Sequence, residues 1–121
     1  MVPTDLSQYA DAKAAAERAT AAQVGDRLLI ARPGLIVGPG DPSDRFGYWP
    51  ARLQRGGRVL APTTEGRHVQ VIDVADLAGW LVKAGGEQRT GTIDAVGETH
   101  PMDKFFDAAI AATSFAGELV K

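Results

Sequence analysis

The order of helix-forming and apolar segments is the feature that most constrains how this chain folds. Residues 7–23 are rich in Ala, Lys, Glu, Arg and Gln and contain neither Gly nor Pro, which predicts a helix with Ser7 as its N-cap and Gly25 as its end. The apolar run Arg27–Ala31 then predicts a buried strand, which Leu35–Val37 extends. Its apolar residues follow one another without alternation, which is typical of parallel sheets covered by helices.

The rest of the chain continues this alternation of helices and strands. Gly38–Pro42 predicts a loop. Asp73 and Asp76 are placed like a capping box and predict the start of a helix that ends near Lys83. We therefore expect an α/β fold in a single domain over residues 1–121, with a mostly parallel sheet and flanking helices. The other predicted elements are helices over 48–54 and 102–113 and strands over 58–61, 69–72 and 91–96.

Composition and charge restrict the classes of partner. The 121 residues include 13 Lys and Arg against 15 Asp and Glu, and the net charge of -2 gives no reason to expect nucleic acid or a membrane surface. No segment approaches the roughly 18–20 uninterrupted apolar residues of a membrane span, and the polar N-terminus is unlike a signal peptide. The sequence has no Cys, which excludes disulfides and thiolate catalysis. These features predict a cytoplasmic protein.

Tyr9 and Lys13 form the most informative pair of side chains. A spacing of four residues on a helix places both on one face. An ordinary tyrosine has a pKa near ~10. A neighbouring ammonium favours the phenolate and makes the hydroxyl usable as a general acid or base. The same pattern also arises when an amphipathic tyrosine lies beside a solvated lysine, so the surrounding sequence has to decide between the two.

That surrounding sequence resembles a known enzyme family. Ala31–Gly34 follows the helix, Val37–Asp41 comes next, and Val71–Ala78 comes later. This succession, from Gln8 to Gly97, resembles the C-terminal half of the extended short-chain dehydrogenase/reductase family, the NAD(P)-dependent epimerase/dehydratase group. The resemblance implies a partial Rossmann-like fold that lacks the N-terminal dinucleotide-binding half, because the family's glycine-rich loop and catalytic Ser/Thr lie upstream of its tyrosine.

The resemblance also implies an activity and a set of site residues. It implies an NAD(P)-dependent oxidoreductase with a small-molecule substrate, in which Tyr9 is the catalytic acid/base. Lys13 contacts the nicotinamide ribose and assists hydride transfer. Pro33, Gly34 and Ile36 contact the nicotinamide side of the bound NAD or NADP. The family builds its substrate pocket at the positions that match Gly38–Asp41 and Phe46–Trp49.

Three functional interpretations remain open. In the first, the chain is a reductase-like enzyme fragment that is inactive alone, binds cofactor weakly or not at all, and self-associates through exposed sheet edge. In the second, it is a non-catalytic remnant or interaction module. In the third, it belongs to a nucleotide-sugar epimerase or dehydratase. The motif Arg32-Pro33-Gly34, where those enzymes carry an aromatic-Asn pattern, favours the reductase over the third interpretation.

The remaining candidate residues favour structural roles. The spacing of Gly34, Gly38 and Gly40 differs from the dinucleotide fingerprint and indicates turn geometry. His68 and His100 lack a ligand-like spacing, so we expect no metal site. Tryptophans in such a chain are typical of a core or a pocket wall; here they are Trp49 and Trp80.

Overall fold

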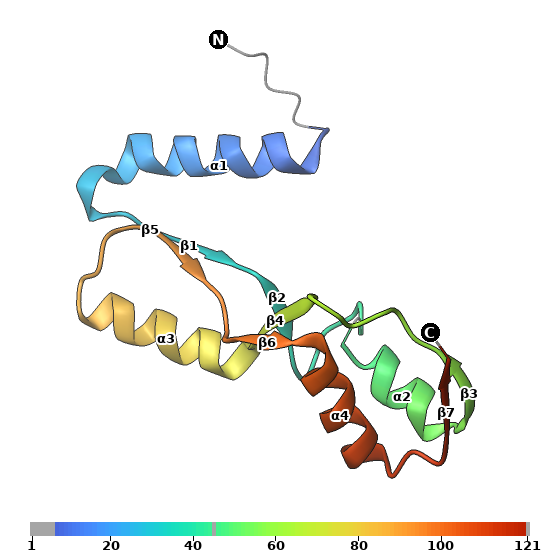
Figure 1. Ribbon diagram of the computed structural model, residues 1–121. Coiled ribbons are helices and arrows are strands. Elements are labelled where there is room, and N and C mark those ends of the chain that lie inside the picture. The colour runs from blue at the N-terminus through green and yellow to red at the C-terminus, as the bar shows by residue number, and fades with distance from the viewer. Residues whose placement is uncertain (1–6, 45, 121) are drawn as a thin grey trace. The chain divides into compact units, whose positions relative to one another are not determined.

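The computed structural model describes residues 7–44 and 46–120 (Figure 1). Its contacts divide the chain into two compact units, each described by itself below. Unit 1 comprises Met1–Arg32 and Ala78–Asp94, and unit 2 comprises Pro33–Leu77 and Ala95–Lys121. The chain is mixed α/β, with strand pairs that are mostly parallel and with flanking helices, which confirms the predicted fold class at this level.

Unit 1 begins with the long alanine-rich helix. This helix, α1 (Tyr9–Val24), ends at Gly25, whose φ of 61° is a conformation that glycine adopts without strain. Gln8 is the N-cap residue, so the prediction of Ser7 is wrong by one position. The apolar side chains of α1 are mostly alanines spread around the helix, and none of its residues is buried.

A two-stranded sheet follows α1 in unit 1. The chain passes through the 3₁₀ turn η1 (Gly25–Arg27) into β1 (Leu29–Pro33), which pairs with β5 (Gly91–Ala95). The backbone N–H of Gly91 donates to the carbonyl of Leu28 at 2.8 Å and closes this sheet. The first strand starts two residues later than the sequence predicted, because the 3₁₀ turn takes up the residues up to Arg27.

Helix α3 (Val74–Gly86) starts in unit 2 and ends in unit 1. Its predicted cap is confirmed: the carboxylate of Asp73 accepts a hydrogen bond from the backbone N–H of Ala75 at 2.7 Å. None of the helices among residues 7–44 and 46–120 combines the length and the apolar character that crossing a membrane requires.

Unit 2 contains a three-stranded sheet in the order β2-β4-β6. The strands β2 (Leu35–Val37) and β4 (His68–Asp73) are parallel, whereas β6 (Thr99–Pro101) runs antiparallel to β4. The sequence predicted that residues 35–37 extend β1. Gly34 instead separates the two segments, so β2 is a strand of its own. The sequence did not predict β6, which is only three residues long and is defined by its pairing with β4.

A second layer of unit 2 holds its hydrophobic core. Helices α2 (Tyr48–Gln54) and α4 (Met102–Thr113) pack together, and β3 (Gly57–Leu60) pairs in parallel with β7 (Gly117–Val120) (Figure 1). One core cluster of this layer consists of the buried residues Leu53, Val59 and Ala109, with Trp49, Ile110, Phe115 and Leu119 packed against them. Because residues from both helices and both strands meet in this core, unit 2 has a framework that can hold a pocket.

Candidate functional site

The two predicted catalytic residues lie at the start of α1. Tyr9 is the first residue of the helix and Lys13 follows four positions later, so both lie on the same face, as the sequence predicted. Both side chains are exposed, and that of Tyr9 is 80% accessible. A small molecule can therefore reach the phenol hydroxyl. The exposure is equally compatible with an ordinary surface tyrosine.

A charged pair fixes α1 against β1 inside unit 1. The guanidinium of Arg32 donates from Nε to Oε1 of Glu17 at 2.9 Å and from Nη2 to Oε2 at 2.6 Å. This bidentate contact lowers the pKa of the Glu17 carboxyl from its ordinary value, with a further contribution from the charge of Lys13. It also raises the pKa of Arg32. Lys13 thus belongs to a small charged network on the helix.

The predicted cofactor-contacting residues lie in unit 2, around the break between β1 and β2. Pro33 is the last residue of β1, and Ile36 is an exposed residue in the middle of β2. A Cβ at Gly34 would lie 3.2 Å from Cγ1 of Val96, a tight contact that requires the Val96 side chain to shift by a few tenths of an ångström. The structure therefore keeps these three residues in one continuous segment, and it places Tyr9 and Lys13 together in unit 1.

The turn interpretation of the glycines after β2 agrees with the backbone. Gly38 and Gly40 have φ values of 131° and 90°, which L-residues rarely adopt. A Cβ on Gly38 would lie 2.8 Å from Cγ1 of Val74, the first residue of α3. The loop after β2 thus approaches the start of α3 closely, at the carboxyl ends of two parallel strands. Ligands commonly bind at this edge in α/β folds.

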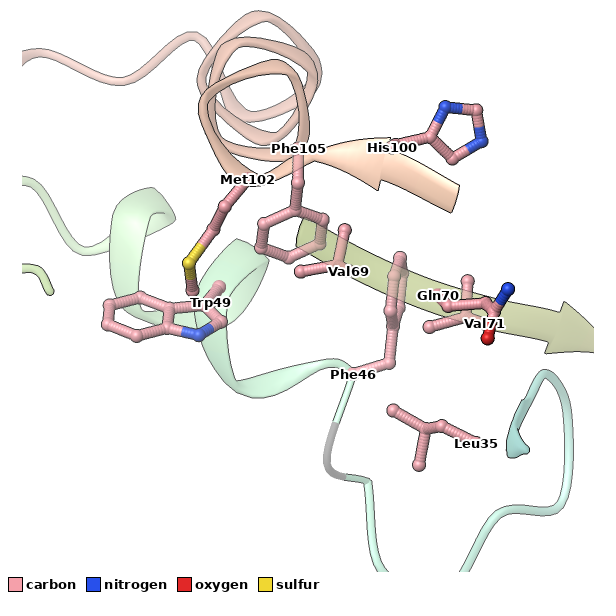
Figure 2. A pocket seen from close by; sticks show the side chains of 9 residues that line it. All are labelled: Leu35, Phe46, Trp49, Val69, Gln70, Val71, His100, Met102 and Phe105. Atoms are coloured by element: carbon pink, nitrogen blue, oxygen red, sulfur yellow. The ribbon is translucent and has the colours of Figure 1, made fainter. Parts of the chain in front are cut away.

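Unit 2 contains an apolar pocket of about 420 Å³, within the size range of small-molecule sites (Figure 2). Its floor is one face of the sheet β2-β4-β6. In that sheet Leu35 is opposite Val71 and Val69 is opposite His100, so these four residues share a face because side chains alternate along a strand.

The walls of the pocket come from helices and from the segment before α2. Met102 and Phe105 project from α4, and Trp49 lies on α2 with Phe46 just before it (Figure 2). The rings of Phe46 and Phe105 meet edge to face, with centroids 5.6 Å apart. The backbone N–H of Met102 donates to the carbonyl of Arg67 at 2.9 Å, which anchors the start of α4 beside β4.

Edge-to-face contacts connect the pocket walls to the interior of unit 2. Phe106 is a buried residue of α4, and its ring centroid lies 5.5 Å from that of Phe105 and 4.9 Å from that of Trp49. Tyr48 continues the series by meeting Trp49 at 5.0 Å. Trp49 packs against the core and also lines the pocket, which agrees with its predicted role as core or pocket wall. This packing restricts the rings, so the shape of the pocket is largely preformed.

The described residues that line the pocket include few polar side chains. Gln70 borders it, but its side chain lies on the other face of β4, where Nε2 donates to Oγ1 of Thr99 at 2.9 Å. His100 is the polar side chain on the pocket face, at its exposed border. Among the described residues that line the pocket, none is Lys, Arg, Asp or Glu.

The two histidines lie on opposite faces of the sheet. His68 is one residue before Val69 on β4, and His100 is directly opposite Val69 on β6. Adjacent residues on a strand point to opposite sides, which separates the two imidazoles. Over the part of the chain that the structure describes, no group of three or more His, Asp or Glu is arranged to hold a metal ion.

This pocket overlaps in part with the segments at which the resemblance implied a substrate pocket. The segment Phe46–Trp49 was predicted to contribute to a substrate pocket, and its first and last residues do line one. The residues Gly38–Asp41 do not line it. Met102, Phe105 and His100 were not predicted as pocket residues. The amphipathic pattern of residues 102–113 could have shown that α4 has an apolar face, but not which cavity that face covers.

Comparisons with family models, with curated proteins and with solved structures returned no match to this chain.

Proposed function

We propose that this chain carries the tyrosine and lysine pair of an NAD(P)-dependent oxidoreductase, a reductase-like member of the extended short-chain dehydrogenase/reductase family. The observation that carries the proposal is the placement of Tyr9 and Lys13 at the start of α1, on one face and open to solvent. The ordered motifs after the helix, Arg32–Gly34 and Val37–Asp41, support it because they follow α1 in the order that the family shows.

The proposed reaction reduces a carbonyl to an alcohol. A nicotinamide cofactor, when bound, supplies the hydride that adds to the carbonyl carbon. Tyr9 donates its phenolic proton to the carbonyl oxygen, so hydride and proton together complete the alcohol. Lys13 holds the nicotinamide ribose and keeps a positive charge beside the phenol, which stabilises the phenolate that remains after the proton transfer. In the reverse direction the phenolate accepts the proton from the alcohol.

Tyr9 and Lys13 fit the ribose at the nicotinamide end of such a cofactor, because they offer a hydroxyl and an ammonium on one face of α1. Pro33, Gly34 and Ile36 form an exposed segment of unit 2, and their contact with the cofactor is what the family resemblance implies. The 121 residues contain neither G-x-G-x-x-G nor G-x-x-G-x-x-G, the patterns that hold a pyrophosphate. The proposal therefore assigns this chain no pyrophosphate site.

The test measures reductase activity after a dinucleotide-binding half with a glycine-rich loop has been joined in frame to these residues. Oxidation of NADH or NADPH is followed with a panel of aldehydes and ketones. We expect Tyr9→Phe to lower kcat by about 10²–10⁴, the usual contribution of a positioned acid/base, while the circular dichroism spectrum stays unchanged.

Thr20→Ala is the matched control. It removes a hydroxyl from the same helix, one that donates to the carbonyl of Ala16 at 2.9 Å, and we expect turnover close to that of the parent protein. A Tyr9→Phe variant that keeps turnover within a factor of two of an active parent would contradict the catalytic assignment. The interpretation as a non-catalytic interaction module would then be favoured.

A further inference from the structure

The pocket in unit 2 has a chemical character that specifies its ligand. Its floor presents three aliphatic side chains and one imidazole, and its walls present three aromatic rings and the thioether of Met102. Aromatic walls favour flat or unsaturated ligands, because rings pack well in stacked and edge-to-face arrangements. Met102 is flexible and polarizable, so it adapts to ligands of somewhat different outline.

Charged ligands find no partner among the described residues of this lining. A nucleotide sugar carries a diphosphate, and burying it requires guanidinium, ammonium or several backbone N–H donors. The described lining residues include no Lys or Arg. An uncharged apolar molecule instead replaces water at no electrostatic cost, and it gains from every apolar surface that it covers.

One polar contact is available, at a defined place. His100 shares the pocket face with Val69, whereas the amide of Gln70 is on the opposite face and bonded to Thr99. In Figure 2 the ring of His100 extends from β6 at the rim of the pocket, away from the other labelled side chains. An imidazole can donate one hydrogen bond to a carbonyl oxygen. A ligand with a single carbonyl at one end of an apolar body thus matches the distribution of polar and apolar lining.

We propose that this pocket binds an uncharged carbonyl compound with a flat apolar body in preference to a nucleotide sugar. This binding preference rests on the pocket of unit 2 alone.

Binding is measured on the 121-residue chain through the fluorescence of Trp49. The variant Trp80→Phe removes the second tryptophan, which lies in unit 1, so that the signal comes from the pocket wall. The probes are 2-acetylnaphthalene as the apolar ketone, 2-ethylnaphthalene as its counterpart without the carbonyl, and UDP-glucose as the nucleotide sugar. We expect saturable quenching by the ketone, weaker binding of the hydrocarbon by about 3- to 10-fold, and no saturable response to UDP-glucose.

The two histidines provide a matched pair of variants. His100→Phe removes the hydrogen bond on the pocket face and is expected to abolish the preference for ketone over hydrocarbon. His68→Phe makes the same change on the other face of the sheet and is expected to preserve it. Both positions are exposed, so neither substitution removes a core contact, and far-UV circular dichroism confirms that each variant is folded.

A second variant tests the apolar character directly. Met102→Lys places an ammonium in the lining and is expected to weaken ketone binding at least tenfold, whereas Lys104→Met, two residues later and outside the lining, is expected to leave it unchanged. Saturable binding of UDP-glucose, or no saturable binding of the ketone, would overturn the proposal. The proposal would also be overturned if His100→Phe and His68→Phe lost the preference for ketone over hydrocarbon to the same extent. The proposed function is tested separately, by the turnover of Tyr9→Phe. Unchanged turnover of that variant would contradict the proposed function and would not affect the conclusions on binding to the pocket.

Discussion

The guanidinium of Arg32 and the carboxylate of Glu17 form two parallel hydrogen bonds, at 2.9 and 2.6 Å, between residues 15 positions apart. They join the middle of α1 to the fourth residue of β1 within unit 1. No residue of α1 is buried, and several are half-buried. The ion pair connects α1, which carries Tyr9 and Lys13, to β1, and its contribution to stability is modest because the Arg32 side chain is 55% exposed.

The pair predicts a loss of stability in acid. The pKa of Glu17 is lowered from 4.5 by the hydrogen bond from Arg32. Because the folded chain then binds fewer protons than the unfolded chain near pH 4, the pair stabilises the fold above the ordinary pKa, and this contribution is lost as the pH falls through the lowered value. We expect Glu17→Gln to make the urea midpoint depend less on pH between about 5 and 3, as followed by circular dichroism.

Glu118→Gln is the control for this prediction. The ion pair of Glu118 with Arg58 is 3.3 Å long, and both side chains are mostly exposed, at 68% and 76%. Exposed pairs are well screened and contribute little, so we expect a smaller change in the midpoint. If Glu17→Gln and Glu118→Gln gave the same profile, the pair with Arg32 would have no special role.

Lys13 is predicted to matter for turnover and not for folding. In the active enzyme, Lys13→Met removes both the proposed ribose contact and the charge beside Tyr9, and we expect kcat/KM to fall by at least tenfold. Lys83→Met is the matched control, since Lys83 is exposed on α3 with its ammonium 3.9 Å from the Glu87 carboxylate. Equal activity of the two variants in a steady-state assay would argue against a role for Lys13.

The 121-residue chain itself is predicted to bind nicotinamide cofactors weakly. Its sequence holds no glycine-rich pyrophosphate loop, and the pyrophosphate is the largest anionic group of the cofactor. We expect no saturable binding of NADH or NADPH below the millimolar range when the titration is followed by isothermal calorimetry. A micromolar Kd for either cofactor would show that another part of the chain binds the pyrophosphate.

Gly38 and Gly40 form a matched pair for the loop after β2. Both have a positive φ, so alanine strains the backbone at either site, by about 1 kcal/mol or more. At Gly38 the new methyl group also meets Val74, while at Gly40 nothing lies within 4 Å of it. We therefore expect Gly38→Ala to lower the free energy of unfolding about 1 kcal/mol more than Gly40→Ala does in urea titrations. The reverse order would mean that the loop moves away from α3 at little cost.

Local sequence patterns predicted the elements that local interactions determine. The helix over 102–113 was predicted with the bounds that α4 has, and Asp73 caps α3 as expected. The strands β6 and β7 were not predicted, because each is short and exists through pairing with β4 or β3, which are distant in sequence. Short strands of this kind carry too few residues for a periodic pattern.

In the candidate sites, too, features that depend on local sequence were predictable, whereas features that depend on contacts between distant residues were not. The spacing of Tyr9 and Lys13 predicted their common face, because both lie on one helix. The pocket could be predicted only at Phe46–Trp49, where a family resemblance pointed to it. Met102 and His100 reach it through the strand register and the packing of α4, which no local pattern specifies.

The alignment of Val69 with His100 also limits how the chain can change in length. An insertion or deletion of one residue at Gly97–Glu98 would slide β6 by one position and turn His100 to the other face of the sheet. If two residues were added or removed together, the side chains of β6 would stay on their present faces of the sheet. Natural variants that keep the imidazole in the pocket are therefore expected to vary this connection in steps of two.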